Sequence, residues 1–351
     1  MEFKILKRSK KSQARLGIIK TNHGEVMTPT FVPVATQAVV KTLDSKETKE
    51  TGAQLLIANT FHLHLKPGEK VVQKAGGLHQ FMNWPESLMT DSAGFQVFSL
   101  KNKKIREEGV YFSSPLDGKE IFLGPKESIK IQEALGADII FAFDECIPPG
   151  AEYQYVKQSV ARTNRWAEIC LKTKKSKQAL YGVIQGEKFK DLRKESANFI
   201  SRLDFDGFGI GGEFGEDKKK MTQMIGWVNE ELPEKKPRHL LGIGHPEDIA
   251  KVIRAGIDTF DCVTPTRFAR HGAAFTSTGR INLSQTRFLK DKNPLDKKCD
   301  CFVCQSYKRN YLSHLFRANE MTGMKFLTFH NLYFFNQEVK KIRQKIKEGD
   351  F

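Results

Sequence analysis

Cysteine and long apolar runs are both scarce in this chain of 351 residues. There are 6 Cys, and three of them lie within six residues of one another, which does not resemble the disulfide framework of a secreted domain. No apolar run approaches the roughly 18 residues that a membrane span needs. The N-terminal segment 1–17 is basic and lacks the apolar stretch of a signal peptide. We therefore expect a cytoplasmic protein without a membrane partner.

Low-complexity linkers and internal repeats are also missing from the sequence. Hydrophobic residues make up 39% of the chain and include 26 Phe, so a substantial core can form. Length alone does not choose between one large barrel and two ordinary domains. Because no linker divides the chain, we predict one domain, residues 1–351, with insertions.

The balance of charge is strongly basic, with a formal net charge of +16. Residues 264–351 hold 17 Lys and Arg against 7 Asp and Glu, so +10 of this charge comes from the last quarter of the chain. A concentrated basic end is typical of a nucleic-acid-binding surface. Solubility alone accounts for the charge equally well.

Short apolar segments bounded by Gly, Asp, Asn or Pro recur along the chain. They are residues 31–35, 54–60, 87–90, 138–145, 179–186, 207–212, 238–244 and 258–263. Amphipathic segments such as Pro125–Leu135, Tyr153–Lys172 and Pro246–Ala255 separate them. Apolar strands alternating with helices indicate a parallel sheet with crossover helices. Eight such strands predict an α/β fold of the (β/α)8, or TIM, barrel type.

Two intervals break this alternation. Within the first, from Asp91 to Gly136, residues 104–124 alternate like an inserted β-hairpin. The second begins at Thr264 and contains the Cys cluster, and we expect residues 264–335 to form an inserted subdomain. From His330 onward apolar residues recur with helical period, which predicts a final helix packed on the barrel.

Polar side chains stand at the ends of several predicted strands. Active sites of this fold lie at the carboxyl ends of the strands, where the sequence places Asp91, Asp144, Gln185 and Asp261. A lone Asp after a strand is often only a helix N-cap, but three around one rim indicate a site. Two carboxylates facing a sugar–base bond can perform glycosyl transfer, one attacking the anomeric carbon and the other moving the proton. A third carboxylate with a carboxamide suits the donors and acceptor of guanine.

The pattern Cys299-x-Cys301-x2-Cys304-x25-His330 supplies four ligands for a tetrahedral metal site. Because four protein ligands leave no open position, we expect one structural Zn²⁺ per chain. The alternative is three incidental cysteines and a histidine of the core.

A weaker pattern, Gly207, Gly209 and Gly212 followed by Glu230, matches the dinucleotide fingerprint G-x-G-x-x-G. That fingerprint should follow a strand and open a helix, whereas these glycines fall inside a predicted strand. Close approach of the backbone to a flat base explains them better, so we predict no organic cofactor.

Two arginines, Arg267 and Arg270, follow Asp261 closely in the segment PTRFARHGAAF. They are placed to hold phosphates on either side of a nucleotide flipped into the active site. Alternatively, they are solvated loop residues.

The whole set of motifs resembles one family. LMTDSAGFQVFSL (88–100), FDEC (143–146), VIQG (183–186), GIDTFDCVTPTR (256–267) and the Cys-His pattern are similar to the queuine tRNA-ribosyltransferase (tRNA-guanine transglycosylase) family of bacterial type. They occur in the family's order, and the similarity runs from about Phe3 to about Lys341. No single motif is decisive, but together they are specific.

The resemblance implies a pentosyltransferase of queuosine synthesis. Such enzymes exchange the wobble guanine in GUN anticodons of tRNAs for Asp, Asn, His and Tyr, through a covalent enzyme–tRNA intermediate, for a 7-deazaguanine base. It implies that Asp261 is the nucleophile and Asp91 the general acid/base. The base would be read by Asp144, Gln185 and the Gly212 backbone, between walls made by Phe95 and Leu241.

The same resemblance implies contacts of Arg267 and Arg270 with the tRNA anticodon loop, and a homodimer. It also implies that residues 264–335 are a zinc-binding, tRNA-contacting subdomain whose zinc ligands are Cys299, Cys301, Cys304 and His330.

One stretch departs from the bacterial pattern. The segment Gly211–Glu216 is one residue shorter and has Glu213 where Leu is expected. It faces the substituent of the base in the family. Glu213 and Glu216 suit the cation of 7-aminomethyl-7-deazaguanine, but queuine also carries a protonated amine, so charge does not separate the two bases and the room in the loop decides. We expect the smaller 7-aminomethyl-7-deazaguanine to be the inserted base, and queuine is the alternative.

Two alternative functions from other classes of protein remain. A non-catalytic tRNA-binding paralogue keeps the zinc site and loses the carboxylates, which the presence of both Asp91 and Asp261 argues against. A glycoside hydrolase on the same barrel leaves the basic C-terminal quarter and the Cys cluster unexplained.

Overall fold

A computed structural model describes residues 1–212 and 218–351 of the chain. Eight parallel strands form a closed barrel in the order β10-β11-β12-β13-β14-β4-β5-β6. Their bounds are β4 (Thr30–Ala35), β5 (Leu55–Ala58), β6 (Ser87–Thr90), β10 (Ile139–Phe141), β11 (Ala179–Ile184), β12 (Gly207–Ile210), β13 (Arg238–Leu240) and β14 (Thr259–Cys262). Each lies within one of the eight apolar segments or extends it by one residue, so the predicted barrel is confirmed.

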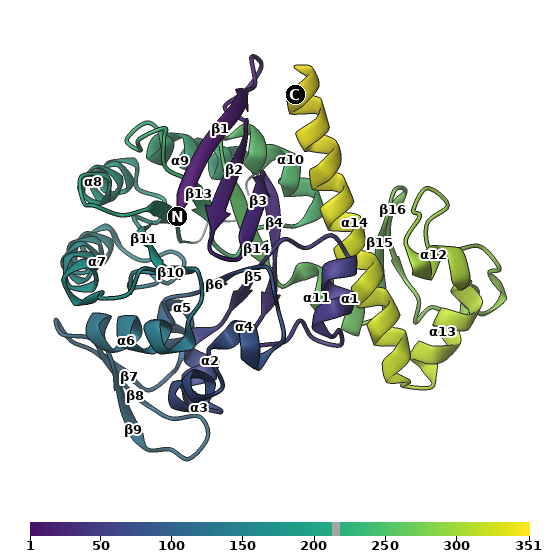
Figure 1. Cartoon of the computed structure of the whole chain (residues 1–351), viewed down its shortest axis with the longest axis horizontal. Helices are drawn as coiled ribbons and strands as arrows, with labels where there is room; N and C mark the ends of the chain where they lie inside the picture. The colour runs from purple at the N-terminus through teal and green to yellow at the C-terminus, as the bar shows by residue number, and fades with distance from the viewer. Residues whose placement is uncertain (213–217) are drawn as a thin grey trace.

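Helices connect the strands and surround the barrel (Figure 1). They are α1 (Ser45–Glu50), α2 (Thr60–Leu65), α3 (Glu69–Lys74), α4 (Leu78–Phe81), α5 (Gly94–Ser99), α6 (Pro125–Leu135), α7 (Tyr153–Thr173), α8 (Lys190–Ser201), α9 (Lys218–Asn229) and α10 (Pro246–Arg254). The start of α6 at Pro125 and its end at Gly136, which has φ 75°, follow the usual preferences for Pro at the start and Gly after the end. The helices predicted at 125–135, 153–172 and 246–255 are confirmed.

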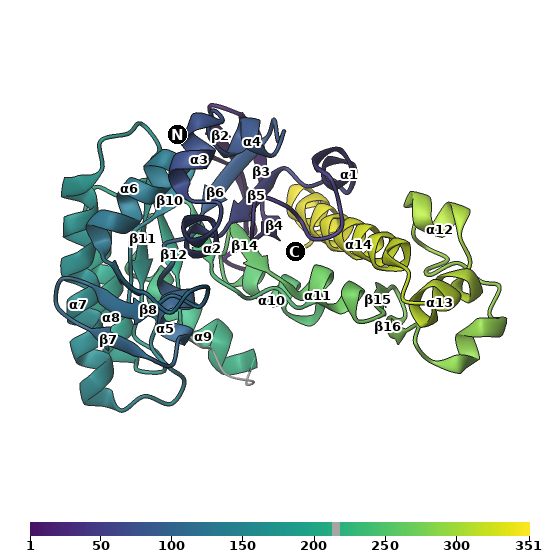
Figure 2. The same cartoon turned by 90° about the horizontal axis from the view of Figure 1, so that it is seen from below.

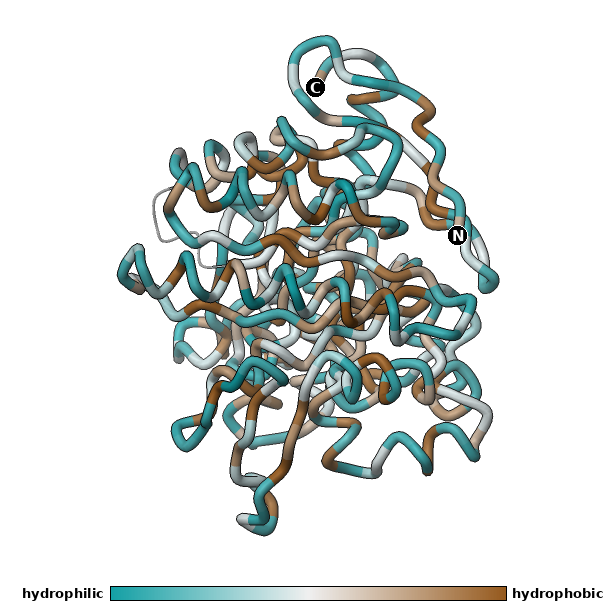
Figure 3. The backbone as a smooth tube through the Cα atoms, turned by 90° about the vertical axis from the view of Figure 1, so that its left-hand side faces the viewer, coloured by the Kyte–Doolittle hydropathy of each residue, from teal (hydrophilic) through white to brown (hydrophobic). Residues whose placement is uncertain are grey.

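The strands have two differently packed faces. In β11, Ala179, Tyr181 and Val183 belong to the core inside the barrel, whereas Leu180 and Ile184 pack against the surrounding helices. Successive side chains of a strand point to opposite faces, so strands buried on both faces are apolar throughout. In Figure 3 the hydrophobic residues lie mainly along the inner segments, and the tips of the outer loops are largely hydrophilic.

A three-stranded antiparallel sheet covers the amino-terminal end of the barrel. It consists of β1 (Glu2–Arg8), β2 (Arg15–Thr21) and β3 (Gly24–Thr28), and Figure 2 shows it at the opposite end from α5. Ile19 and Val26 join the core inside the barrel. The buried guanidinium of Arg15 binds both carboxylate oxygens of Asp258, just before β14, at 2.8 and 2.5 Å. This end is therefore closed, and a ligand can enter the barrel mouth only from the other end.

The first predicted insertion is antiparallel, as expected. It contains β7 (Lys103–Ile105), β8 (Val110–Ser113) and β9 (Glu120–Leu123). The predicted hairpin corresponds to β8 and β9, and β7 adds a third strand to it.

The second insertion follows the barrel and projects beside it (Figures 1 and 2). Its elements are α11 (Thr264–Arg270), β15 (Ala273–Thr276), β16 (Gly279–Asn282), the 3-10 helix η1 (Thr286–Lys290), α12 (Phe302–Ser306) and α13 (Arg309–Arg317). The final helix, α14 (Met321–Glu348), begins nine residues before the predicted start at His330. It therefore belongs to the insertion at one end and packs on the barrel at the other. The predicted boundary at residue 335 falls inside it, and the division into one domain with a subdomain stays a prediction.

None of the helices in the described part of the chain is both long and apolar enough to cross a membrane.

Candidate active site and metal centre

A cavity of about 760 Å³ opens at the carboxyl ends of the barrel strands. Its size lies within the usual range for small-molecule sites. All seven residues predicted to catalyse or to hold the base line it: Asp91, Phe95, Asp144, Gln185, Gly212, Leu241 and Asp261. The fold therefore brings together residues from six segments that are distant in the sequence.

Strand periodicity explains how two of the polar groups come to face inward. Met89 and Val183 point into the barrel, and Asp91 and Gln185 follow them by two residues. Side chains two residues apart share one face of a strand, so the alternation that buries the apolar residues also aims the polar ones into the mouth. Asp261 lies within β14 and lines the cavity, with 14% of its side chain accessible.

Asp91 is held by three donors from the barrel rim. Asn59 Nδ2 donates to Oδ2 at 2.5 Å, and the backbone N–H groups of Thr60 and Ala93 donate to Oδ1 at 2.9 and 3.1 Å. Burial nevertheless raises the pKa of Asp91 to about 7, and the nearby carboxylates of Asp261 and Asp144 add to this rise. Asp91 is thus able to gain and lose a proton near neutral pH.

The turn after β6 brings Asp91 and Asp144 to the same site. Ala93 has a left-handed backbone with φ 73°, and Gly94 follows it. A Cβ on Gly94 would lie 2.6 Å from the Asp144 carbonyl oxygen, so only glycine allows this approach. Ser92 between them donates its hydroxyl to Asp144 Oδ1 at 2.7 Å.

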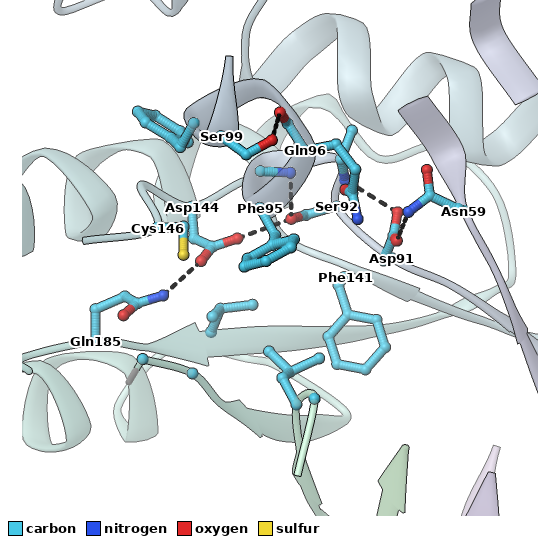
Figure 4. Close-up of a pocket in the computed structure, with 18 of the residues that line it drawn as sticks. Asn59, Asp91, Ser92, Phe95, Gln96, Ser99, Phe141, Asp144, Cys146 and Gln185 are labelled. Atoms are coloured by element: carbon cyan, nitrogen blue, oxygen red, sulfur yellow. Dashed lines mark hydrogen bonds between the residues drawn. The ribbon is translucent and has the colours of Figure 1, made fainter. Parts of the chain in front are cut away.

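Asp144 and Gln185 form a buried polar pair. Gln185 Nε2 donates to Asp144 Oδ2 at 2.7 Å, as Figure 4 shows. Burial raises the pKa of Asp144 above its ordinary value. Gln185 Oε1 is buried and has no hydrogen-bond partner among the described residues. An unsatisfied buried acceptor is unfavourable, so this pair is suited to a ligand that brings its own donors.

The walls of the cavity are apolar on both sides of this pair. Phe95, on α5, is 67% exposed although it is a large aromatic side chain. In Figure 4 its ring lies in view between Asp144 and Asp91. Leu241 lines the cavity from the end of β13, and Gly212, with φ 101°, contributes backbone. A planar ring system fits between such walls.

Asp261 is anchored through one oxygen. Its Oδ1 lies 3.1 Å from His239 Nε2 and accepts the Gly242 N–H at 3.0 Å. His239 is fully buried on β13, and its Nδ1 lies 2.8 Å from Thr259 Oγ1. Asp91 and Asp261 therefore face one cavity with different surroundings.

Sequence reasoning did not assign a function to Asn59, Ser92 or His239. Each touches a predicted site residue only because of the fold. For His239 a signal was present, because it is a polar residue in an apolar strand two positions before Leu241 and so on the same face. For Ser92 the sequence gives no such signal.

Arg267 and Arg270 do not line the cavity. They lie on the short helix α11 rather than in a loop, directly after Val263, which does line it. Arg267 is exposed, whereas Arg270 is half-buried and donates to the Thr266 carbonyl at 3.1 Å. Burial lowers the pKa of Arg270, and the neighbouring Arg267 adds to this effect. The two arginines therefore lie near the edge of the cavity but outside it.

The predicted metal ligands converge. Cys299, Cys301 and Cys304 Sγ lie 3.8, 3.5 and 3.4 Å from His330 Nδ1. A tetrahedral zinc ion with ordinary bond lengths separates sulfur and nitrogen ligands by about 3.5 Å, so the four residues fit this ion. His330 Nε2 lies 2.8 Å from the Phe275 carbonyl oxygen, which fixes the ring and leaves Nδ1 for the metal. The arrangement is compatible with zinc and joins α12 to α14.

A second cluster of possible ligands lies at the closed end of the barrel. His23 Nδ1 and His79 Nε2 lie 2.7 and 3.2 Å from the two oxygens of Asp138, and the two rings stack at 3.5 Å. Parallel stacked rings do not direct both nitrogens at one ion, and the shorter separation is that of a hydrogen bond. We interpret this cluster as a hydrogen-bonded contact between the β2–β3 turn and the barrel.

The glycine fingerprint fails its structural test. Gly207 and Gly209 lie inside β12. They are therefore part of a strand, whereas the glycines of a dinucleotide site follow a strand and open a helix. The predicted carboxylates Glu213 and Glu216, beside the base substituent, lie outside the described residues.

Comparison with known proteins gives a consistent result. The family model described as queuine tRNA-ribosyltransferase matches residues 9–351. A queuine tRNA-ribosyltransferase of Natranaerobius thermophilus is 48% identical, with 100% of this chain and 96% of the relative covered. Those of Thermoanaerobacter sp. and Bacillus subtilis are 47% and 46% identical, with 99% and 100% of this chain and 94% of each relative covered.

Proposed function

Because the chain belongs to the queuine tRNA-ribosyltransferase family, a family of transferases acting on tRNA, we propose that it exchanges the wobble guanine of GUN anticodons for a 7-deazaguanine base. One observation carries the proposal. Two carboxylates, Asp91 and Asp261, face a single cavity that also holds a buried carboxylate–carboxamide pair. The first two groups suit the chemistry of a glycosidic bond, and the pair suits recognition of a guanine-like base.

Asp261 is the nucleophile in this proposal. Its carboxylate lines the cavity and is partly accessible, which allows contact with C1′ of the target nucleoside. A bond forms between a carboxylate oxygen and C1′ while the bond from C1′ to N9 of guanine breaks, and the electron pair leaves with the base. The product is a covalent enzyme–tRNA ester.

Asp91 moves the proton. With a pKa of about 7 it holds a proton in a large fraction of molecules at neutral pH, and it gives this proton to the departing guanine. The resulting carboxylate then accepts the proton of the incoming base as that base attacks C1′ and releases Asp261. One carboxyl group serves both half-reactions, and atoms and charges balance over the cycle.

Asp144, Gln185 and Gly212 read the base. The carboxylate of Asp144 accepts from N–H groups on the Watson–Crick edge of guanine, and Gln185 Oε1 is a further acceptor without a partner among the described residues. A backbone N–H at Gly212 suits the O6 acceptor, while Phe95 and Leu241 enclose the ring faces. A site built from buried polar groups rejects bases that leave those groups unpaired.

The remaining partners follow from the same proposal. Cys299, Cys301, Cys304 and His330 hold a structural zinc ion, which supplies folding energy rather than chemistry. Arg267 and Arg270 contact phosphates of the anticodon loop. The protein acts in the cytoplasm as a homodimer. We propose 7-aminomethyl-7-deazaguanine as the incoming base, with queuine as the alternative.

Exchange of labelled guanine into unmodified tRNA tests the proposal directly. The purified protein is incubated with radiolabelled guanine and tRNA, and incorporation of label is measured, together with a protein–tRNA adduct on a denaturing gel. Label and adduct are both expected. A protein that binds tRNA and yields neither would be a non-catalytic tRNA-binding paralogue.

A further inference from the structure

His239 is a buried histidine within the catalytic end of the barrel that no step of the proposed reaction has used. It is fully buried on β13, and its ring packs against Phe141 with centroids 5.3 Å apart. Its two nitrogens contact different groups of β14, Thr259 Oγ1 at 2.8 Å and Asp261 Oδ1 at 3.1 Å. The ring therefore bridges the inward-facing side of one strand to the carboxylate at the mouth.

The chemistry of the partners fixes the direction of these hydrogen bonds. A carboxylate only accepts, so the proton of this contact must lie on His239 Nε2. In the neutral ring Nδ1 then accepts from the Thr259 hydroxyl, which rotates to suit. The result is a chain in which Thr259 O–H donates to His239 and His239 N–H donates to Asp261.

A second donor converges on the same oxygen. The backbone N–H of Gly242 donates to Asp261 Oδ1 at 3.0 Å. Within the described residues both contacts to this carboxylate fall on Oδ1, which distinguishes it from Oδ2. Two fixed donors hold the carboxylate plane in one orientation and leave Oδ2 as the oxygen with a lone pair for attack.

We propose that His239 is the positioning residue of the nucleophile, directing Oδ2 of Asp261 to C1′ and stabilising the carboxylate when the ester breaks. The proposal rests on Asp261 being the nucleophile. In the first half-reaction the Oδ2–C1′ bond forms and Oδ1 becomes the ester carbonyl oxygen. In the second, the incoming N9 bonds to C1′, the C1′–Oδ2 bond breaks, and its electron pair returns to a carboxylate whose charge is shared with Oδ1.

The two half-reactions should depend on His239 differently. Donors to Oδ1 stabilise the negative charge that develops there as the ester breaks, which accelerates release of the tRNA from the enzyme. During attack the same charge is being lost, so the donors help only through orientation. Removing one fixed donor of this kind typically slows the step that develops charge by about 10²–10³-fold. Ester breakdown should therefore slow more than ester formation.

Single-turnover experiments separate the two steps. Protein and unmodified tRNA form the adduct, excess guanine is then added, and the decay of the adduct is followed on denaturing gels. In His239→Leu we expect decay at least 30-fold slower than in wild type, a smaller loss in formation, and KM for guanine and Kd for tRNA within threefold. His239→Gln, whose amide can place an N–H near the original Nε2 position, should recover decay to within about tenfold of wild type.

Control variants test whether His239 acts only by stabilising the fold. His79→Leu makes the same substitution at the closed end of the barrel and should leave adduct decay unchanged. If His239→Leu does not fold, two other variants test whether His239 positions Asp261. They are His239→Gln and Thr259→Val, and the second removes the donor to Nδ1 at nearly constant side-chain volume. Thr259→Val should slow decay by several-fold, because Nδ1 then loses the hydroxyl that holds the ring in place beside Asp261.

If His239→Leu folds and its adduct decays within threefold of the wild-type rate, the assignment is overturned. If His239→Leu does not fold, the same result in Thr259→Val overturns it. A Gln variant as slow as the Leu variant would also overturn it, because the donated hydrogen bond would then not be the cause. Absence of any adduct in the wild-type protein would instead reject Asp261 as the nucleophile, and the inference with it.

Discussion

Replacing Asp91 with Asn should make the protein more stable at alkaline pH while slowing its reaction. Burial, with help from the charges of Asp261 and Asp144, raises the pKa of Asp91 from 3.8 to about 7. The folded state therefore binds this proton more tightly than the unfolded chain does. The stability that the protonated group contributes is fully present below about pH 4 and is lost as the pH rises to about 7.

The size of the effect follows from the two pKa values. Their separation corresponds to about 4 kcal/mol of free energy of unfolding. Between pH 5 and pH 8 the wild-type protein loses about 2–3 kcal/mol of this stabilisation. The variant loses none of its stability in this way, because Asn cannot ionise. The variant also places an amide near the Asn59 donor, which costs about 1–3 kcal/mol at every pH. The free energy of unfolding of the variant, relative to that of the wild type, should thus increase by about 2–3 kcal/mol between pH 5 and pH 8.

The assay is urea unfolding of both proteins at several pH values, with free energies from linear extrapolation. Asp138→Asn is the matched control, a buried carboxylate at the other end of the barrel. Burial opposes ionisation of Asp138, but hydrogen bonds from His79, His23 and the Leu88 N–H outweigh it and lower the pKa of Asp138. Because the pKa of Asp138 lies below 3.8, this control should destabilise the protein by about the same amount from pH 8 down to pH 5, and by less only as the pH falls below about 4.

Exchange activity should move in the opposite direction from stability. Asn at position 91 cannot transfer the proton, so kcat should fall by about 10²–10⁴-fold. A gain in stability that does not change between pH 5 and pH 8 would refute the raised pKa of Asp91. Turnover within a few-fold of wild type would refute its role as the acid and base.

Four further outcomes are expected. Asp261→Asn should abolish the covalent adduct and leave tRNA binding nearly intact, because an amide is a poor nucleophile of the same shape; an undiminished adduct on a denaturing gel would remove Asp261 from its role. Cys304→Ala should lose one zinc per chain by metal analysis and lower the Tm, because metal binding contributes folding energy; wild-type protein purified without chelator and free of zinc would contradict this. Arg267→Ala and Arg270→Ala should weaken tRNA binding and each reduce the log–log salt slope by about 0.7, whereas Arg202→Ala, an exposed control at the end of α8 and outside residues 264–335, should not; equal slopes in all three would leave the arginines without a phosphate contact. In competition for exchange, 7-aminomethyl-7-deazaguanine should have a higher kcat/KM than queuine, and equal or reversed values would favour queuine.

The barrel was predictable because its signals are local. Each strand is an apolar run buried on both faces, and Pro125 and Gly136 mark the ends of α6 whatever surrounds them. The third strand of the first insertion was missed because β7 has only three residues, too few to show a period. The early start of α14 was missed because the apolar residues before His330 pack within the insertion, away from the face that the pattern followed.

Local patterns in the sequence also predicted several of the residues that line the cavity. Polar residues at strand ends identify Asp91 and Gln185, and tight spacing identifies the three cysteines. The sequence did not determine the contacts and pKa values that depend on residues from distant segments. The fold brings His330 to the thiols and places His239 beneath Asp261. It also buries Asp91 near two other carboxylates, and this surrounding sets its pKa near 7. Periodicity and spacing are properties of adjacent residues, whereas desolvation and the energy between charges depend on distances through space that only the closed barrel fixes.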